Sequence, residues 1–317
     1  MFTPRRVFAV VLVATAAMCG VATAATVVGL PGFEPKNEAA AQALERQRKA
    51  YELINKANQH VYATLPSCKP KLPTGSATAT HDIPSQAILD AIAPLRRAAT
   101  PADGTTSGSM PRGFGSETYV DYTRRVTAAD GTRLTIVIAR SVRPWFKPTA
   151  RCLDAQHARL VTLLSHESPA LRSAALRAFA QSRKAWAKQP EPPATPQDGI
   201  YLFTEGGGGG GGGIASFRER GNLTSFSGGK GGNRRSTLHG LVPDGVATVT
   251  LEYPKTQSRG PYYKPAVYPS AYSRTVHVQQ NVFSVHVPRG DGAFPPRMVW
   301  RNAAGTVIHV YKEPQPR

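Results

Sequence analysis

The chain has 317 residues, of which 41% are hydrophobic and 19% are charged. This length predicts about two domains, and the hydrophobic content supports buried cores, which excludes a wholly disordered chain. Lysine and arginine outnumber aspartate and glutamate by 39 to 20, which gives a formal charge of +19. Residues 25–198 and 199–317 are both basic. Such a positive field attracts anionic polymers and lipid headgroups.

Residues 1–25 have the pattern of a secretory signal peptide. Two arginines precede an apolar stretch, and Ala22-Thr23-Ala24 fits the small-x-small rule for cleavage. We expect cleavage after Ala24 or Ala25 and a secreted or cell-envelope protein. Two alternatives stay open. The uncharged run reaches Phe33, long enough for an uncleaved N-terminal membrane anchor, and the two arginines loosely fit a twin-arginine signal.

Residues 26–190 are expected to form a helical α+β domain that includes a β-hairpin. Leu44, Tyr51, Asn58 and Leu65 recur every seven residues, which predicts a helix over 37–65. An ordinary packed helix is favoured over a coiled coil because Asn58 interrupts the seam. The other elements predicted here are a helix from Asp82 to Ala93, a hairpin of Tyr119–Val126 and Thr132–Arg140, and helices over Leu153–Leu164 and Pro169–Lys188.

Residues 191–198 are rich in proline and are predicted to be a linker. Beyond them the hydrophobic pattern alternates with period two, which predicts a small antiparallel β-sandwich over 199–317. Residues 206–232 are expected to be a mobile glycine-rich loop, because eight consecutive glycines offer no side chains to pack. The predicted strands are Val246–Tyr253, Arg274–Gln280, Val282–Val287, Arg297–Trp300 and Thr306–Tyr311.

Several short stretches look familiar: Leu95-Arg96-Arg97, Gly240-Leu241-Val242-Pro243-Asp244-Gly245-Val246 and Asn281-Val282-Phe283. Together they resemble an uncharacterised family of exported proteins from high-GC Gram-positive bacteria. The resemblance implies export and a layout in two parts. It implies no activity, and therefore no catalytic residue.

Two cysteines remain once the signal is removed, Cys68 and Cys152. Disulfides persist outside the cytoplasm, so a single Cys68–Cys152 bridge is the expected arrangement. Two isolated thiols are the alternative.

The titratable residues form no recognisable catalytic or metal motif. His166-Glu167 begins an HExxH pattern, but Ala170 stands where the second histidine belongs. His157 is expected to be a partly buried packing residue. Ser227 and Lys230 have the S-x-x-K spacing but fall in the glycine-rich segment. The alternation of the strands predicts that His277, His286 and His309 all point outward, which leaves a surface metal site as an alternative. No cofactor is expected.

The helix over Pro169–Lys188 carries five basic residues and no acidic one, which favours either an anionic membrane surface or an ordinary solvated helix face. The whole pattern favours a non-catalytic, exported interaction protein of unknown ligand. Its expected partner is an anionic envelope polymer, a membrane surface or another protein, and not nucleic acid. The alternative is a secreted hydrolase with an unrecognised active site.

Overall fold

A computed structural model of the chain describes residues 34–69, 78–103, 116–141, 148–188, 197–205, 208–228, 235–259, 262–287 and 294–313. The predicted signal peptide and most of the predicted linker lie outside these ranges. The described residues form a mixed α+β protein with six α-helices and several antiparallel sheets, which confirms the α+β class alone. None of the helices among them is long and apolar enough to cross a membrane.

Contacts divide the chain into two compact units. A helical unit takes residues 1–71, 145–192 and 258–266, and a sheet unit takes residues 72–144, 193–257 and 267–317. This division differs from the predicted boundary near residue 191. The reason is that strand β4 (Arg133–Ser141) pairs along its length with β5 (Gln197–Thr204), from Leu134↔Thr204 to Ser141↔Gln197.

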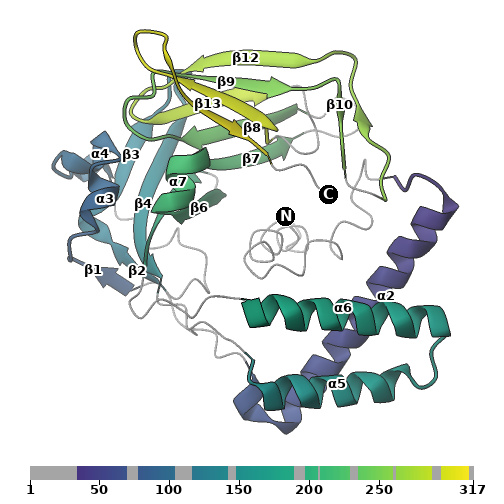
Figure 1. Ribbon diagram of the computed structural model, residues 1–317. Coiled ribbons are helices and arrows are strands. Elements are labelled where there is room, and N and C mark those ends of the chain that lie inside the picture. The colour runs from purple at the N-terminus through teal and green to yellow at the C-terminus, as the bar shows by residue number, and fades with distance from the viewer. Residues whose placement is uncertain are drawn as a thin grey trace, which may run out of the picture. The chain divides into compact units, whose positions relative to one another are not determined.

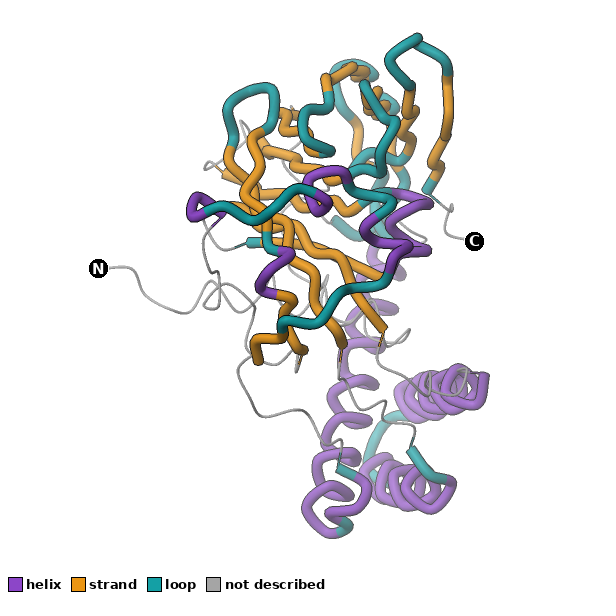
Figure 2. The backbone as a smooth tube through the Cα atoms, turned by 90° about the vertical axis from the view of Figure 1, so that its left-hand side faces the viewer, coloured by secondary structure: helices purple, strands orange, loops and turns teal. Residues whose placement is uncertain are grey.

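The helical unit is built from α2 (Glu38–Thr64), α5 (Ala150–Leu164) and α6 (Pro169–Lys188), with a short 3₁₀ turn η2 (Pro66–Cys68). Helix α2 starts where the Asn37 side chain accepts a hydrogen bond from the Ala40 amide (2.9 Å). It crosses both α5 and α6, which are seen almost end-on in the second view (Figures 1 and 2). Of the predicted seven-residue repeat, Leu44 is buried, and Tyr51, Asn58 and Leu65 are half-buried. Ile54 and Val61 complete the buried side of the helix.

The sheet unit contains three larger sheets. The six-stranded sheet has the order β1-β2-β4-β5-β6, with β3 paired to β4, while the other two have the orders β12-β9-β14-β15 and β13-β8-β7. The strands not yet bounded are β1 (Thr78–Thr80), β2 (Ser116–Tyr119), β3 (Arg124–Thr127), β6 (Gly209–Gly213), β7 (Asn222–Gly228), β8 (Arg235–Leu241), β9 (Thr248–Tyr253), β12 (Tyr272–His277), β13 (Val282–Val287), β14 (Arg297–Arg301) and β15 (Val307–Lys312); the short β10 (Thr256–Gln257) and β11 (Ala266–Val267) form a pair of their own.

Apolar side chains of these sheets gather in separate buried clusters. One cluster combines Ile136, Ile200 and Leu202 from the six-stranded sheet with Phe217 from α7 (Ile214–Arg220). A second cluster lies between strands of the four- and three-stranded sheets and includes Leu251, Phe283, Met298 and Trp300. Strands β12 and β13 are consecutive in the chain, but each pairs in a different sheet. Gln280 and Asn281 make the turn between them at positive φ.

The predicted helix from Asp82 to Ala93 is wrong in its extent. Two short helices occur instead, α3 (Gln86–Leu89) and α4 (Ala93–Arg96). Pro94 opens α4 rather than ending the earlier helix, because a missing amide costs nothing in the first helical turn. Ile88, Ile92 and Leu95 of this region are all buried.

The prediction of a mobile loop over 206–232 is also wrong where the chain is described. Gly209–Gly213 forms strand β6 on the edge of β5, and α7 and β7 follow it. Glycine is needed there because the backbones approach closely. A Cβ at Gly211 would lie 2.4 Å from both the Ile200 carbonyl oxygen and the Tyr201 ring. Backbone pairing thus orders a segment that has no side chains of its own.

Replacing Gly211 with alanine should therefore lower the free energy of unfolding by about 1–3 kcal/mol, as expected for overpacking. Gly213→Ala is the matched control, since a Cβ at Gly213 meets nothing within 4 Å, and it should change stability by less than about 0.5 kcal/mol. Thermal denaturation of both variants measures the difference. Equal stability of the two would mean that β6 does not pack as described.

Candidate anion-binding surface

The α5–α6 pair concentrates positive charge in the helical unit. Residues 150–188 hold seven lysines and arginines against two acidic residues, Asp154 and Glu167. The predicted helix Pro169–Lys188 is confirmed with the same bounds. Its start is set by Ser168, whose hydroxyl accepts from the Leu171 amide (3.4 Å).

The apolar side of α6 is used inside the protein. Leu171, Ala175 and Phe179 are buried in a cluster with residues of α2 and α5, including Ile54 and Leu160. A helix that lies on a membrane needs its apolar side free to enter the lipid. The packing of α6 therefore favours the solvated-face interpretation over membrane insertion.

Two of the five cations on α6 have partners on α5 or at its C-terminal end. The Arg172 guanidinium donates to the carbonyls of Leu164 (3.2 Å) and Ser165 (3.2 Å), at the C-terminal end of α5. A cation is favourable there because the last carbonyls of a helix lack partners within it. Arg183 pairs with Asp154 of α5 at 3.0 Å.

The other three cations, Arg177, Lys184 and Lys188, are exposed; we call them the cationic stripe. Their spacing places them within about 40° of one another around the helix, on the side opposite Phe179. Along the axis they are separated by about 10 Å and about 6 Å. Arg177 also donates to the Ser173 hydroxyl (2.7 Å). The stripe therefore presents a short row of positive charges to solvent.

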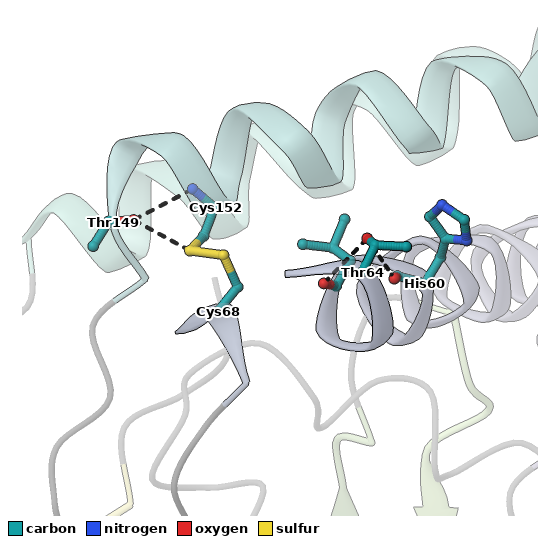
Figure 3. Close-up of a disulfide and its surroundings, with 6 residues drawn as sticks. His60, Thr64, Cys68, Thr149 and Cys152 are labelled. Atoms are coloured by element: carbon teal, nitrogen blue, oxygen red, sulfur yellow. Dashed lines mark hydrogen bonds between the residues drawn. A yellow bond between two sulfur atoms is a disulfide. The ribbon is translucent and has the colours of Figure 1, made fainter. Parts of the chain in front are cut away.

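A disulfide joins the 3₁₀ turn η2, which follows α2, to the start of α5. Cys68 in η2 and Cys152 in the first turn of α5 are bonded, with their Cα atoms 5.5 Å apart (Figure 3). Thr149 caps α5 by accepting from the Cys152 amide (3.3 Å), and this cap holds Cys152 toward Cys68. The predicted pairing is confirmed. Both cysteines are buried with Val61.

The histidines singled out in the sequence are dispersed. His157 is exposed and stacks on Phe179 with ring centroids 5.6 Å apart, so the expectation of partial burial is wrong. His286 contacts the Thr237 hydroxyl (2.9 Å), and His277 is exposed on β12. Within the ranges that the structure describes, no group of three or more His, Cys, Asp or Glu residues is placed to hold a metal ion.

His309 does not point outward as predicted. It is half-buried, 4.8 Å from the Trp300 ring, and its Nε2 lies 2.6 Å from the Glu219 carbonyl oxygen. The exposed side of β15 instead carries Ile308 and Val310, which are 46% and 38% exposed. The register explains this result, because His309 pairs with Trp300, whose side chain enters the core. Lys230 of the S-x-x-K spacing lies outside the described residues.

The stretches that carry the family resemblance meet at one junction in the sheet unit. The Asp244 carboxylate accepts from the Ala93 amide (2.8 Å) and the Asn281 side chain (2.7 Å), and it pairs with Arg96 (2.7 Å). Asn281 in turn donates to the Val242 carbonyl (3.0 Å). These side chains hold backbone groups and one another in place, so their role is structural.

The largest pKa shift next to this junction also belongs to a group with a structural role. The Arg97 guanidinium, bonded at 2.5 Å, holds the pKa of buried Asp103 well below its usual range. Amides of Thr100 and Arg125 donate to the same carboxylate at 2.7 and 2.9 Å. A carboxylate held by these hydrogen bonds stays ionised near neutral pH, so it has no proton to exchange there.

Sequence reasoning missed His239, which is 6% exposed on the central strand β8. Burial lowers the pKa of its imidazole. It lines a pocket of about 530 Å³ near the start of β4 and the end of β5. Thr237, His239 and Leu241 are spaced two residues apart, which predicts one side of a strand and could have placed His239 there. No catalytic motif surrounds it.

Comparison of the chain with protein-family models, with curated proteins and with solved structures finds no match.

Proposed function

We propose that this is an exported, non-catalytic interaction protein that binds an anionic polymer of the cell envelope through the cationic stripe on α6. Export is supported by the signal-like residues 1–25 and by a disulfide of the kind that persists outside the cytoplasm. The observation that carries the polymer proposal is the stripe itself. Three exposed cations lie in a row on a helix without an acidic residue.

A polymer suits this surface better than a lipid bilayer. The apolar residues of α6 are packed against α2 and α5, so the helix offers charge without an apolar anchor. Arg177 can hold a phosphate oxygen pair through its planar guanidinium, and the two lysines act as point charges. We further propose that the four- and three-stranded sheets form the predicted β-sandwich, which the apolar cluster between them supports.

The test compares two variants of equal net charge. In the stripe variant, Arg177, Lys184 and Lys188 are replaced by glutamine; in the control, the exposed residues Lys255, Arg274 and Lys312 of the sheet unit are replaced by glutamine. Binding to poly(glycerol phosphate) is measured by calorimetry. The stripe variant should bind at least about tenfold more weakly, a change of about 1.4 kcal/mol, while the control should bind nearly as wild type does.

Equal weakening by the two variants would show that only net charge matters and would overturn the stripe as a site. Vesicles of phosphatidylglycerol are measured in parallel. Tighter binding to vesicles than to the polymer would contradict the choice of a polymer as the partner.

A secreted hydrolase is the second candidate, and the pocket at His239 is the observation that favours it. Asp130 interacts electrostatically with His239, and hydrogen bonds connect Asp130 and Thr132 with Ser284. We prefer the non-catalytic proposal because the most strongly shifted carboxylate, that of Asp103, is held by structural hydrogen bonds away from this pocket.

A further inference from the structure

Strand β15 lies at one edge of its sheet, and its outer side is open. The sheet has the order β12-β9-β14-β15, so β14 is the only described strand that pairs with β15. At the end of this pairing the Glu313 amide donates to the Pro296 carbonyl (2.8 Å). Backbone groups alternate between the two sides of a strand, so Tyr311 and Glu313 face β14. The N–H and C=O groups of Val310 and Lys312 therefore point away from it.

The side chains along this edge are mostly apolar. Val307, Ile308 and Val310 are all exposed. The register shifts after Trp300, so that Val307 and Ile308 both lie opposite Arg301. This bulge explains why two consecutive apolar residues reach solvent. It lies at the start of β15 and leaves the rest of the strand regular.

The opposite edge of the same sheet is built differently. Strand β12 exposes Ser273, Arg274, Thr275 and His277. Polar and charged side chains on an edge oppose pairing with another chain. On β15 the apolar residues leave Lys312 as the one exposed charge. Of the two edges, β15 is therefore the one suited to accept a further strand.

Lys312 determines which charge suits that strand. It is exposed, and among the described residues no acidic side chain pairs with it. Arg297, its cross-strand neighbour, is already paired with Glu252. Glu313 comes next in the chain but alternates to the other side of the sheet. An acidic side chain placed opposite Lys312 would therefore meet an unpaired cation.

We propose that the open side of β15 binds an extended segment of a partner protein, in which an acidic residue is followed by two apolar residues at alternate positions. The segment adds as an antiparallel strand, the more stable arrangement per residue. Its backbone bonds to Val310 and Lys312, its apolar side chains cover Ile308 and Val310, and its acidic side chain pairs with Lys312. This site belongs to the sheet unit and does not rest on the cationic stripe.

A second copy of the chain suits this edge less well. Its own β15 would present only Ile308, Val310 and Lys312 on this side, so each Lys312 would meet no acidic residue. Two strongly basic chains also repel each other. An acidic segment from another protein satisfies both the backbone groups and the charge.

The experiment titrates the full exported chain with capped peptides by calorimetry. The probe is Glu-Thr-Val-Thr-Val-Thr, whose glutamate and valines are spaced to lie opposite Lys312, Val310 and Ile308. It should bind with a dissociation constant below about 1 mM. Methylating the amide nitrogen of the first valine should weaken binding at least about tenfold, because the Val310 carbonyl loses its donor. Methylating the preceding threonine is the matched control and should change little, because that amide points to solvent.

Two variants test the same contacts from the side of the protein. Lys312→Glu should weaken binding of the probe at least about threefold and strengthen binding of Lys-Thr-Val-Thr-Val-Thr by a similar factor. Val310→Pro removes an outward amide that β14 does not use, and it should abolish binding of the probe. Ser273→Pro makes the matched change on β12, where alternation also turns the amide away from the neighbouring strand, and should bind as wild type does.

Lys312 is exposed, so its variant keeps the proposal testable even if Val310→Pro unfolds. The proposal is overturned if the probe fails to bind at several millimolar, if the two methylated peptides bind equally, or if Lys312→Glu still prefers the glutamate peptide. Sedimentation showing a dimer that is lost in Val310→Pro alone would assign the edge to a second copy and overturn the partner. The stripe variant should bind the probe as wild type does; loss of binding there would place the peptide on α6 and contradict the proposal.

Discussion

Replacing Arg124 with methionine should lower the free energy of unfolding of the sheet unit by about 3–5 kcal/mol, because several buried carbonyl groups would lose their hydrogen-bond donor. Arg124 is 2% exposed, and its guanidinium donates to five backbone carbonyls; the acceptors are Pro94, Leu95, Arg97, Asp121 and Thr123. Methionine fills much of the same space but donates nothing. The midpoint of thermal unfolding should fall by about 10 °C.

Arg125→Met is the matched control for this change. Arg125 is the next residue on the same strand, but its side chain is exposed. Its amide bond to Asp103 belongs to the backbone and survives the substitution (2.9 Å). The control should change stability by less than about 0.5 kcal/mol. Equal losses in both variants would show that Arg124 does not hold the ends of α4 and η4 (Val120–Tyr122) together.

Removing the disulfide should have the second large effect, and it should be confined to the helical unit. The bridge closes a separation of 84 residues, for which the chain-entropy model gives about 4.5 kcal/mol. This value is an upper limit on the stability that the disulfide contributes, because strands β1 to β4 lie within the closed segment and remain folded. In the double variant Cys68→Ala, Cys152→Ala, hydrogen exchange read peptide by peptide should accelerate in α5 and the end of α2.

The sheet strands outside the helical unit serve as the internal control and should exchange at the wild-type rate. Reducing agent should reproduce the effect in wild type and add nothing in the double variant. Unchanged exchange in α5, or two free thiols in the unfolded and unreduced exported protein, would contradict the disulfide.

The helical unit could be predicted well because its signals are local. Caps and prolines marked the helix ends, and Pro169–Lys188 was predicted to the residue. The disulfide followed from counting cysteines in an exported chain. His157 was placed wrongly because its exposure depends on how far α5 rotates against Phe179, which periodicity alone does not determine.

The sheet unit was harder because its pairings join distant segments. Nothing near Gly209–Gly213 predicts a strand, since the partner β5 supplies both the hydrogen bonds and the apolar rings. The orientation of β15 depends on its register with β14, so His309 was assigned to the outer side, whereas it lies half-buried against Trp300. A shift of one residue reverses every side chain of a strand.

The two candidate sites also differ in whether their residues are neighbours in the sequence. The cationic stripe lies on one helix, so its charges could be read from the sequence. The pocket at His239 joins residues about a hundred positions apart, from β4 and β8, and needed the tertiary structure.

The dependence of polymer affinity on salt tests the central claim most directly. Each polymer charge neutralised by a bound cation contributes about 0.7 to the slope of log affinity against log salt for a single-stranded polyanion. For poly(glycerol phosphate), the slope of the stripe variant should therefore be smaller than that of wild type by about 2. The Lys255, Arg274 and Lys312 control should keep the wild-type slope. A stripe variant whose slope equals that of wild type would contradict binding through α6.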